Sequence, residues 1–257
     1  MAIKLYGYFR SSAAFRVRIA LNLKKLEYET ASIHLRRNDQ TKSDYLAVNP
    51  QGLVPTLADG GRTLIQSLAI VEYLEETYPE PPLLPKHPAD RARIRALAEI
   101  VACDIHPINN LRVLRYLTHS LGHDEAAIAS WYNHWIAAGF EALEKLLADD
   151  SRTGGFCHGE TPSLADVTLV PQVVNAERYR LDLAPYPTIT RIFGHCMALE
   201  PFVAAHPDLY EKQDGKPARL RALGGKLALG SLGVAGFAVG ADMDFKSMKP
   251  MGSGAVP

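Results

Sequence analysis

Residues 6–18 read YGYFRSSAAFRVR and join two different kinds of pattern. The β-branched and aromatic run Ile3–Tyr8 leads into them, and apolar residues at helical spacing continue to Leu21. The pattern predicts a strand, a turn and a helix. A serine at such a junction caps the helix with its hydroxyl, and the free amide groups of the first turn point outward. We therefore expect a corner that favours an anion, such as a thiolate or a carboxylate.

Three polar residues stand at this junction. Ser11 and Ser12 can each cap the helix or face the anion, and Arg10 adds a positive charge just before the turn. Taken alone, the same residues also fit an ordinary cap beside a solvated arginine, because caps are common at helix starts. Both interpretations stay open on this stretch.

The composition excludes several classes of protein. The chain has 257 residues, a formal net charge of +0 and 47% hydrophobic residues, which is ordinary for a globular protein of one or two domains and gives no electrostatic signal for nucleic acid. Its three cysteines are far apart and predict neither a disulfide framework nor a metal site. This usage fits a reducing cytoplasm, and the N-terminus shows no pattern of a signal peptide.

The first third of the chain predicts a small mixed sheet. Tyr28–Ile33 forms a second strand, which completes a βαβ unit, and residues 36–44 form a polar connection. Val54-Pro55 then stands directly before a short apolar strand. We expect a cis bond here, with the Val54 backbone facing an extended, peptide-like ligand. A trans proline at a strand edge is the alternative that base rates favour.

A second corner resembles the first. Asp59–Arg62 predicts a hairpin turn, and a helix from Leu68 to Thr77 follows Gln66 and Ser67. Ser67 is the expected N-cap of this helix. The hydroxyl and the free amides then offer another place for a carboxylate, although an ordinary cap is equally compatible with the stretch.

Composition divides the chain into four parts. Residues 1–80 form the α/β part, residues 81–89 a proline-rich linker, and residues 90–211 an all-helical part. Residues 212–257 are rich in glycine and alanine, and we expect a disordered tail, with a membrane-touching or partner-binding segment as the alternative. Their uncharged stretch is too short to span a membrane.

Within the helical part, residues 90–119 predict one helix that Pro107 kinks, and residues 124–148 predict another. Ser163 and Asp166 match a capping box, which we interpret as structural.

Ordered motifs over residues 3–210 are similar to those of the zeta-class glutathione transferase family. The motifs are Ser11–Leu21, Asn49-Pro50, Val54–Leu57, Gln66–Ile70, Asp104–Asn110, and Ala176–Tyr179 with Asp182–Pro187. The resemblance implies a thioredoxin-like α/β N-terminal domain followed by an all-α C-terminal domain. One position departs from the family motif, since Ala13 stands where the family has a cysteine. Behaviour that needs a thiol at that position is therefore in doubt.

The resemblance implies glutathione as the cofactor. Ser11 would donate to the glutathione thiolate beside Ser12, and the Val54 backbone would pair with the cysteinyl part. The remaining expected cofactor residues are Gln66 and Ser67 at the γ-glutamyl end, and His106 and Asn110 from the helical domain. Apart from the family resemblance, His106 fits a polar helix residue beside a proline kink equally well.

The resemblance also implies an activity. The expected reaction is the cis–trans isomerisation of maleylacetoacetate in tyrosine and phenylalanine breakdown, by reversible addition of the thiolate. Arg10 and Arg178 would bind the carboxylates of the small dicarboxylate substrate, although Arg178 alone also fits a surface salt bridge. A homodimer is implied as well. The alternatives are isomerisation of maleylpyruvate, conjugation of glutathione to other substrates, and a binding module without catalysis.

Overall fold

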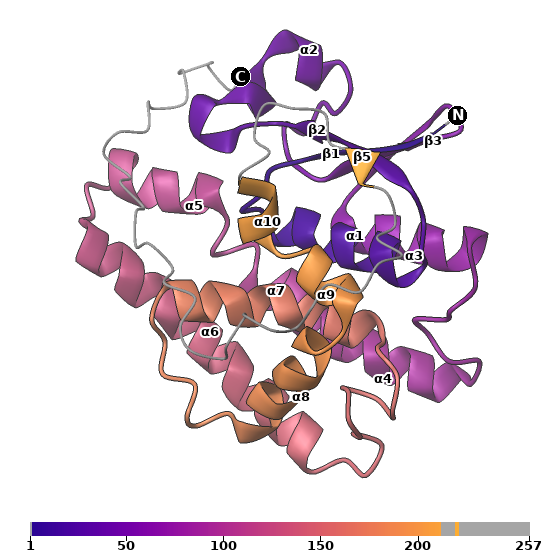
Figure 1. Ribbon diagram of the computed structural model, residues 1–257. Helices are drawn as coiled ribbons and strands as arrows, with labels where there is room; N and C mark the ends of the chain where they lie inside the picture. Colours follow the sequence, from indigo (N-terminus) through magenta and orange to yellow (C-terminus); the bar gives the residue numbers. More distant parts are fainter. Residues whose placement is uncertain (1, 212–218, 221–257) are drawn as a thin grey trace.

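The computed structural model describes residues 2–211 and 219–220 and has the predicted two parts (Figure 1). Strand β1 (Ile3–Gly7) leads into helix α1 (Ser12–Leu23), and β2 (Tyr28–Ser32) pairs with β1 in parallel. The pairing runs in register from Ile3 opposite Tyr28 to Gly7 opposite Ser32. The predicted βαβ unit is confirmed.

Two further strands extend the sheet. Strands β3 (Thr56–Asp59) and β4 (Arg62–Ile65) form the predicted hairpin, and β3 runs antiparallel to β1. With β5 (Arg219–Leu220) on the other side, the order is β4-β3-β1-β2-β5. The Val54–Pro55 bond before β3 is cis, as predicted. Helix α3 (Ser67–Thr77) follows β4 directly.

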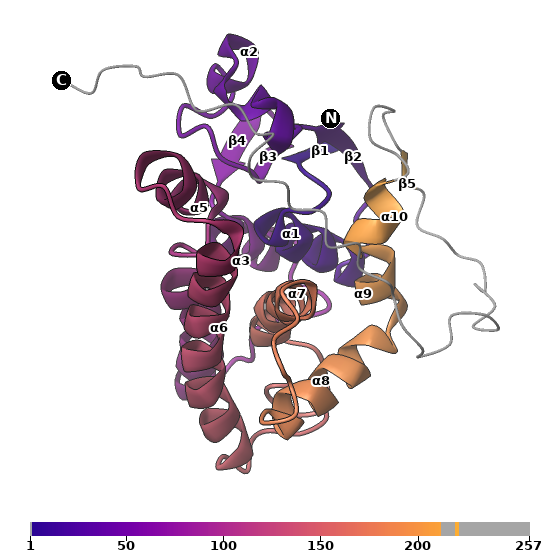
Figure 2. The same ribbon diagram turned by 90° about the vertical axis from the view of Figure 1, so that its left-hand side faces the viewer.

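Helix α1 is buried along nearly its whole length. It lies between the sheet and helix α7 (Leu164–Arg178), as Figure 2 shows, and its residues 12–21 are all buried. The buried set includes two charged side chains, Arg16 and Arg18. Arg18 donates to the carbonyl oxygens of Ala205 and Phe9. A helix with no solvent-facing side must accommodate its charged residues inside the protein, which makes each of them a candidate for a specific task.

The connection after β2 contains structure that was not predicted. Residues 36–44 were expected only as a polar connection, and the structure has the short helices η1 (Leu35–Arg37), η2 (Asp39–Thr41) and α2 (Ser43–Leu46) there. The Asp39 carboxylate accepts the His34 amide and closes the first turn. Helices this short leave no apolar period in the sequence.

The helical part begins with α4 (Pro88–Glu99), the π-helical turn η3 (Ile100–Ile105), α5 (Leu111–Arg115) and the π-helical turn η4 (Tyr116–Ser120). One kinked helix was predicted here. The chain is interrupted instead at 106–110, where Asn110 restarts it by accepting the Arg112 amide. The remaining helices are α6 (Glu125–Ala148), α7, α8 (Pro187–Met197), α9 (Glu200–Ala204) and α10 (Pro207–Glu211). The capping box of Ser163 and Asp166 at the start of α7 is confirmed.

A buried ion pair ties the linker to the α/β part. Glu75 of α3 accepts the amides of Leu83 and Leu84, and the ammonium group of Lys24 lies 2.8 Å from its carboxylate. Lys24 also donates to the carbonyl oxygens of Tyr78 and Pro81. The path between the two parts is therefore fixed by hydrogen bonds on both sides.

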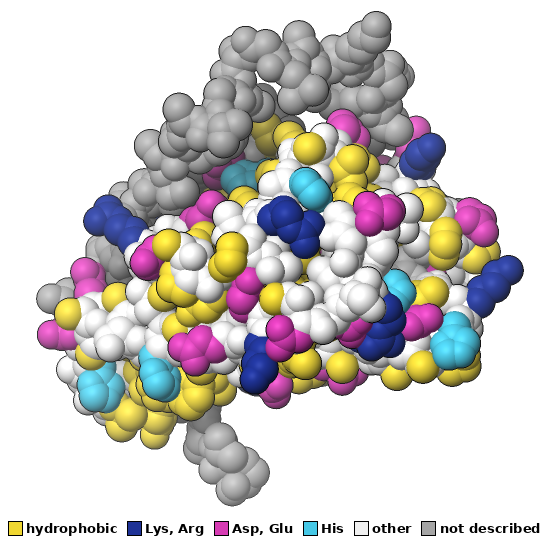
Figure 3. Space-filling model, turned by 90° about the horizontal axis from the view of Figure 1, so that it is seen from below, with side chains coloured by type: hydrophobic (Ala, Val, Ile, Leu, Met, Phe, Trp, Pro, Cys, Tyr) yellow, Lys and Arg dark blue, Asp and Glu magenta, His cyan; other side chains and the backbone are white. Residues whose placement is uncertain are grey.

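On the face drawn in Figure 3, basic and acidic side chains alternate without a large patch of one sign, in keeping with the zero net charge. In the part of the chain that the structure describes, no helix is both long and apolar enough to cross a membrane. The predicted disorder of the tail lies outside the described residues, except that Arg219 and Leu220 pair with β2.

Candidate functional site

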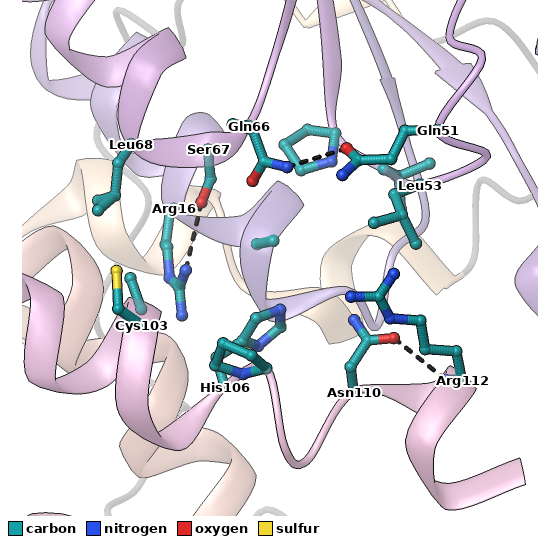
Figure 4. Close-up of a pocket in the computed structure, with 15 residues that line it drawn as sticks. Arg16, Gln51, Leu53, Gln66, Ser67, Leu68, Cys103, His106, Asn110 and Arg112 are labelled. Atoms are coloured by element: carbon teal, nitrogen blue, oxygen red, sulfur yellow. Dashed lines mark hydrogen bonds between the residues drawn. The ribbon is translucent and has the colours of Figure 1, made fainter. Parts of the chain in front are cut away.

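A cavity of about 390 Å³ lies where the α/β part meets the helical part (Figure 4). Val54, Gln66 and Ser67 line it from the α/β part, and His106 and Asn110 line it from the segment between η3 and α5. These are five of the residues that the sequence predicted for cofactor binding. They are far apart in the chain, and the fold brings them to one cavity.

The two serines at the start of α1 have separate roles. Ser11 is the N-cap, and its hydroxyl oxygen accepts the Ala14 amide at 3.2 Å. The Ser12 hydroxyl lies 3.2 Å from Nδ1 of His106 and links α1 to the helical part. Neither serine is among the described residues that line the cavity, although Ser12 adjoins it, because it precedes Ala13 and contacts His106. The hydroxyl hydrogen of Ser11 remains available for a further acceptor, because the cap uses only its oxygen.

His106 is held in its neutral form. Burial, together with the positive charges of Arg16 and Arg112, lowers the pKa of His106 to about 3. One ring nitrogen faces Ser12, so the other is free to act toward the cavity as a donor or an acceptor, according to the tautomer. A neutral imidazole in this place forms hydrogen bonds without adding charge.

The start of α3 differs from the prediction. Ser67 was expected to be the N-cap, but Gln66 occupies that position with φ 69°, and Ser67 is the first residue of the helix. The Ser67 hydroxyl oxygen accepts Nη1 of Arg16 at 3.2 Å, and Gln66 donates to Gln51. The prediction was wrong because a buried guanidinium from another helix binds the hydroxyl that a cap would have used. A non-glycine residue with positive φ is uncommon, and such strain concentrates at functional sites.

Arg16 is the site residue that sequence reasoning missed. Its side chain is 2% exposed and lines the cavity, and the described residues give its Nε and Nη2 atoms no hydrogen-bond partner. Burial lowers the pKa of Arg16 to about 10, so the group stays charged at neutral pH. A buried charge without a counter-charge is costly, so this arginine favours an anionic ligand in the cavity. The available signal was a pair of arginines, Arg16 and Arg18, inside a mostly apolar helix.

The two arginines expected to bind substrate lie together but outside the cavity lining. Burial lowers the pKa of Arg178, and the charge of Arg10 lowers it further, so the two groups are close enough to repel each other. Tyr132, which stacks on Tyr179 with ring centroids 3.6 Å apart, lies within the electrostatic reach of both Arg178 and Arg16. Two neighbouring cations suit a ligand with two carboxylates.

The cavity is lined by a thiol, but at a different position from the cysteine of the family motif. Ala13 lines the cavity from α1, and Cys103 lines it from η3. Within the described residues, no cluster of side chains could hold a metal ion. The cavity therefore offers hydrogen-bond donors, a buried cation and two helix starts, a set that fits a small peptide with carboxylates at its ends.

Comparisons with known proteins agree with this geometry. Residues 5–82 match the family model described as the glutathione S-transferase N-terminal domain, and residues 125–222 match the C-terminal domain. A relative from Ralstonia sp. named maleylpyruvate isomerase is 52% identical and covers 80% of this chain and 97% of its own length. A maleylacetoacetate isomerase from Pseudomonas aeruginosa is 47% identical, with 80% and 96% covered.

A solved structure has the same fold. It is a maleylacetoacetate isomerase from Methylobacterium extorquens AM1 with bound malonate and glutathione. It superposes with a TM-score of 0.78 at 45% identity, and the match covers 79% of this chain and 96% of that one.

Proposed function

Because the chain belongs to the glutathione S-transferase family, we propose that it is a glutathione-dependent isomerase that converts maleylacetoacetate into fumarylacetoacetate. The observation that carries the proposal is the pairing of two features. A helix start with a free hydroxyl hydrogen lies at Ser11, and a pair of neighbouring cations lies at Arg10 and Arg178. The first suits a thiolate and the second suits a substrate with two carboxylates.

The residues of the cavity would hold the cofactor. The orphaned Nε and Nη2 atoms of Arg16 and the strained Gln66 fit an anionic peptide, and Ser67 and the Val54 backbone complete that wall. His106 and Asn110 would hold it from the helical part, and Ser12 would keep His106 in position. Malonate and glutathione bound in the relative from Methylobacterium extorquens support this assignment.

Bound glutathione supplies a thiol whose anion adds reversibly to the cis double bond and so permits rotation about it. Ser11 favours the anion, because its hydroxyl hydrogen can be donated to sulfur while its oxygen accepts the Ala14 amide. The start of the 12-residue helix α1 adds the favourable end of a helix dipole, worth about 0.3–1 kcal/mol. Arg10 and Arg178 would hold the carboxylates of the substrate and keep its double bond near Ser11.

A second function is favoured by a specific observation. The relative from Ralstonia sp. at 52% identity is named maleylpyruvate isomerase, so maleylpyruvate is the alternative substrate. The same residues would serve both reactions, because both substrates carry two carboxylates and a cis double bond. A module that only binds would not require two charged or dipolar anion sites beside one cavity.

The test uses the purified full chain with maleylacetoacetate and maleylpyruvate, each with and without glutathione. Turnover that requires glutathione and favours maleylacetoacetate supports the proposal. Turnover that favours maleylpyruvate supports the second function instead. Glutathione binding without turnover of either substrate would overturn both and leave a conjugating transferase or a binding module.

We infer three further properties that go with this function. The enzyme acts in tyrosine and phenylalanine breakdown, in the cytoplasm, where glutathione stays reduced and the three free cysteines persist. It works as a homodimer, as the family resemblance implies. Light scattering measures the dimer directly, and growth of a deletion strain on tyrosine tests the pathway.

A further inference from the structure

Cys103 places an accessible thiol in the wall of the cavity. Of the three free cysteines, Cys157 and Cys196 are buried, whereas Cys103 is exposed. Figure 4 shows Cys103 on the same side of the cavity as Leu68 and Arg16. A reagent that enters the cavity can therefore meet this thiol and neither of the other two.

Arg16 is a second, independent feature that points to a ligand at this place. Its guanidinium group is buried, lines the same cavity and has two nitrogen atoms without a partner among the described residues. Burial, and after it Glu99 and Asp104, raise the pKa of the Cys103 thiol, and the nearby charge of Arg16 offsets only part of that rise. An anion drawn to Arg16 is thus brought next to a sulfur nucleophile.

We propose that Cys103 is a site of reversible modification by anionic disulfides, with glutathione disulfide as the probe. The Cys103 thiolate attacks one sulfur of the disulfide, and a new sulfur–sulfur bond forms as the old one breaks. The other half leaves as a thiolate and takes up a proton from water. Cys103 is oxidised and the disulfide is reduced, so the exchange needs no other oxidant.

The consequence is control of the cavity by the redox state of the thiol pool. The added group would fill the space beside Arg16 and Ser67 and exclude the cofactor, and a reducing thiol would restore the free cavity. The inference goes beyond the isomerase activity and depends on it only for the choice of probe. Modification is measured by mass, so it can be found or excluded whether or not the protein isomerises either substrate.

The experiment follows modification of the full chain by intact mass and peptide mapping. We expect one glutathionyl group, confined to Cys103, absent from Cys103→Ser and removed by dithiothreitol. Glutathione disulfide should react about 10-fold faster than cystamine, a disulfide with positive charges, because the buried cation attracts one and repels the other. S-methylglutathione, which cannot exchange, should slow the reaction by occupying the cavity.

Arg16→Gln should remove the preference for the anionic disulfide, and Arg16→Lys should keep part of it. If Arg16→Gln folds poorly, raising the salt concentration with the unaltered chain makes the same test, since salt weakens charge attraction and should narrow the difference between the two disulfides. The proposal is overturned by any of three results. They are no adduct on Cys103, an adduct on Cys157 or Cys196 at the same rate, or equal rates for the two disulfides at low salt.

Discussion

The two helices that begin beside the cavity, α1 and α3, start from similar sequence signals but use their serines differently. At α1, Ser11 accepts the Ala14 amide and stays a true cap. At α3, Ser67 lies inside the helix and accepts the guanidinium group of Arg16. At Ser11 itself an anion meets the hydroxyl and the helix dipole, whereas at Ser67 it also meets the buried full charge of Arg16.

This difference predicts a division of labour. A helix dipole contributes about 0.3–1 kcal/mol to an exposed anion, while a hydrogen bond to a charged group contributes about 1.5–3 kcal/mol. The stronger interaction at α3 suits firm retention of a carboxylate. The weaker one at α1 suits a thiolate that must form, react and leave. We therefore expect the start of α3 to bind the carboxylate of the cofactor and the start of α1 to stabilise the reacting thiolate. The following experiments test that division.

The largest effect is expected from Ser11→Ala. Loss of the hydroxyl should lower kcat about 100- to 1000-fold, as for removal of one donor that stabilises a reacting anion, while the Kd of glutathione changes far less. Steady-state kinetics and calorimetric titration measure the two quantities. Ser11→Thr is the matched control, because it keeps both the hydroxyl and the cap. Equal rates for Ser11→Ala and the parent would place the chemistry elsewhere.

Arg16→Gln should act on binding instead. Replacing a charged donor with a neutral one should raise the Kd of glutathione about 10- to 100-fold and leave kcat at saturating glutathione nearly unchanged. The thermal midpoint should hold or rise, because the variant removes an uncompensated buried charge. The Kd of glutathione for Arg16→Lys, which keeps the charge, should lie between those of the parent and Arg16→Gln. An unchanged Kd in Arg16→Gln would contradict the assignment of holding to α3.

Arg10→Gln sharpens the comparison at the α1 side. We expect about a 10-fold higher KM for the dicarboxylate substrate, with no change in the Kd of glutathione. Arg178→Gln should behave in the same way. The double variant should lose less free energy of substrate binding than the two single variants lose in total, because the neighbouring charges bind one ligand. Full additivity would mean that the two arginines act at separate places.

The smallest effect concerns His106, which joins α1 to the helical part. Its folded pKa of about 3 lies below the ordinary 6.5, so the unfolded chain takes up a proton first as the pH falls, and the stability due to neutral His106 is lost from pH 6.5 down to about pH 3. Between pH 6.5 and about 4, the thermal midpoint of the parent should therefore fall by a few degrees more than that of His106→Gln. Parallel curves for parent and variant in scanning calorimetry would refute this.

The sequence predicted the elements whose pattern is local. The βαβ unit, the hairpin at Asp59–Arg62 and the capping box at Ser163 depend on neighbouring residues, and each is confirmed. The cis bond at Val54–Pro55 is confirmed too, but base rates favoured a trans bond there and only the wider context predicted the cis one. The short helices between 35 and 46 were missed because they have no apolar period.

The errors at the site came from contacts between distant segments. Arg16 and Ser67 are 51 residues apart, and nothing near Ser67 in the sequence shows that a guanidinium will take its hydroxyl. The same holds for Ser12 and His106, which are 94 residues apart. Both serines were placed correctly at helix starts, but their partners could not be inferred before the fold was known.

The buried pair of Lys24 and Glu75 has a consequence for how fast the cavity can be filled. Because Glu75 accepts the amides of Leu83 and Leu84, this part of the linker is held against the α/β part, and we expect no hinge motion of the two parts about it. The cofactor then enters a cavity whose walls are already in place, and binding does not have to wait for a closing motion. We expect association in a single kinetic step whose rate rises linearly with glutathione concentration and does not saturate.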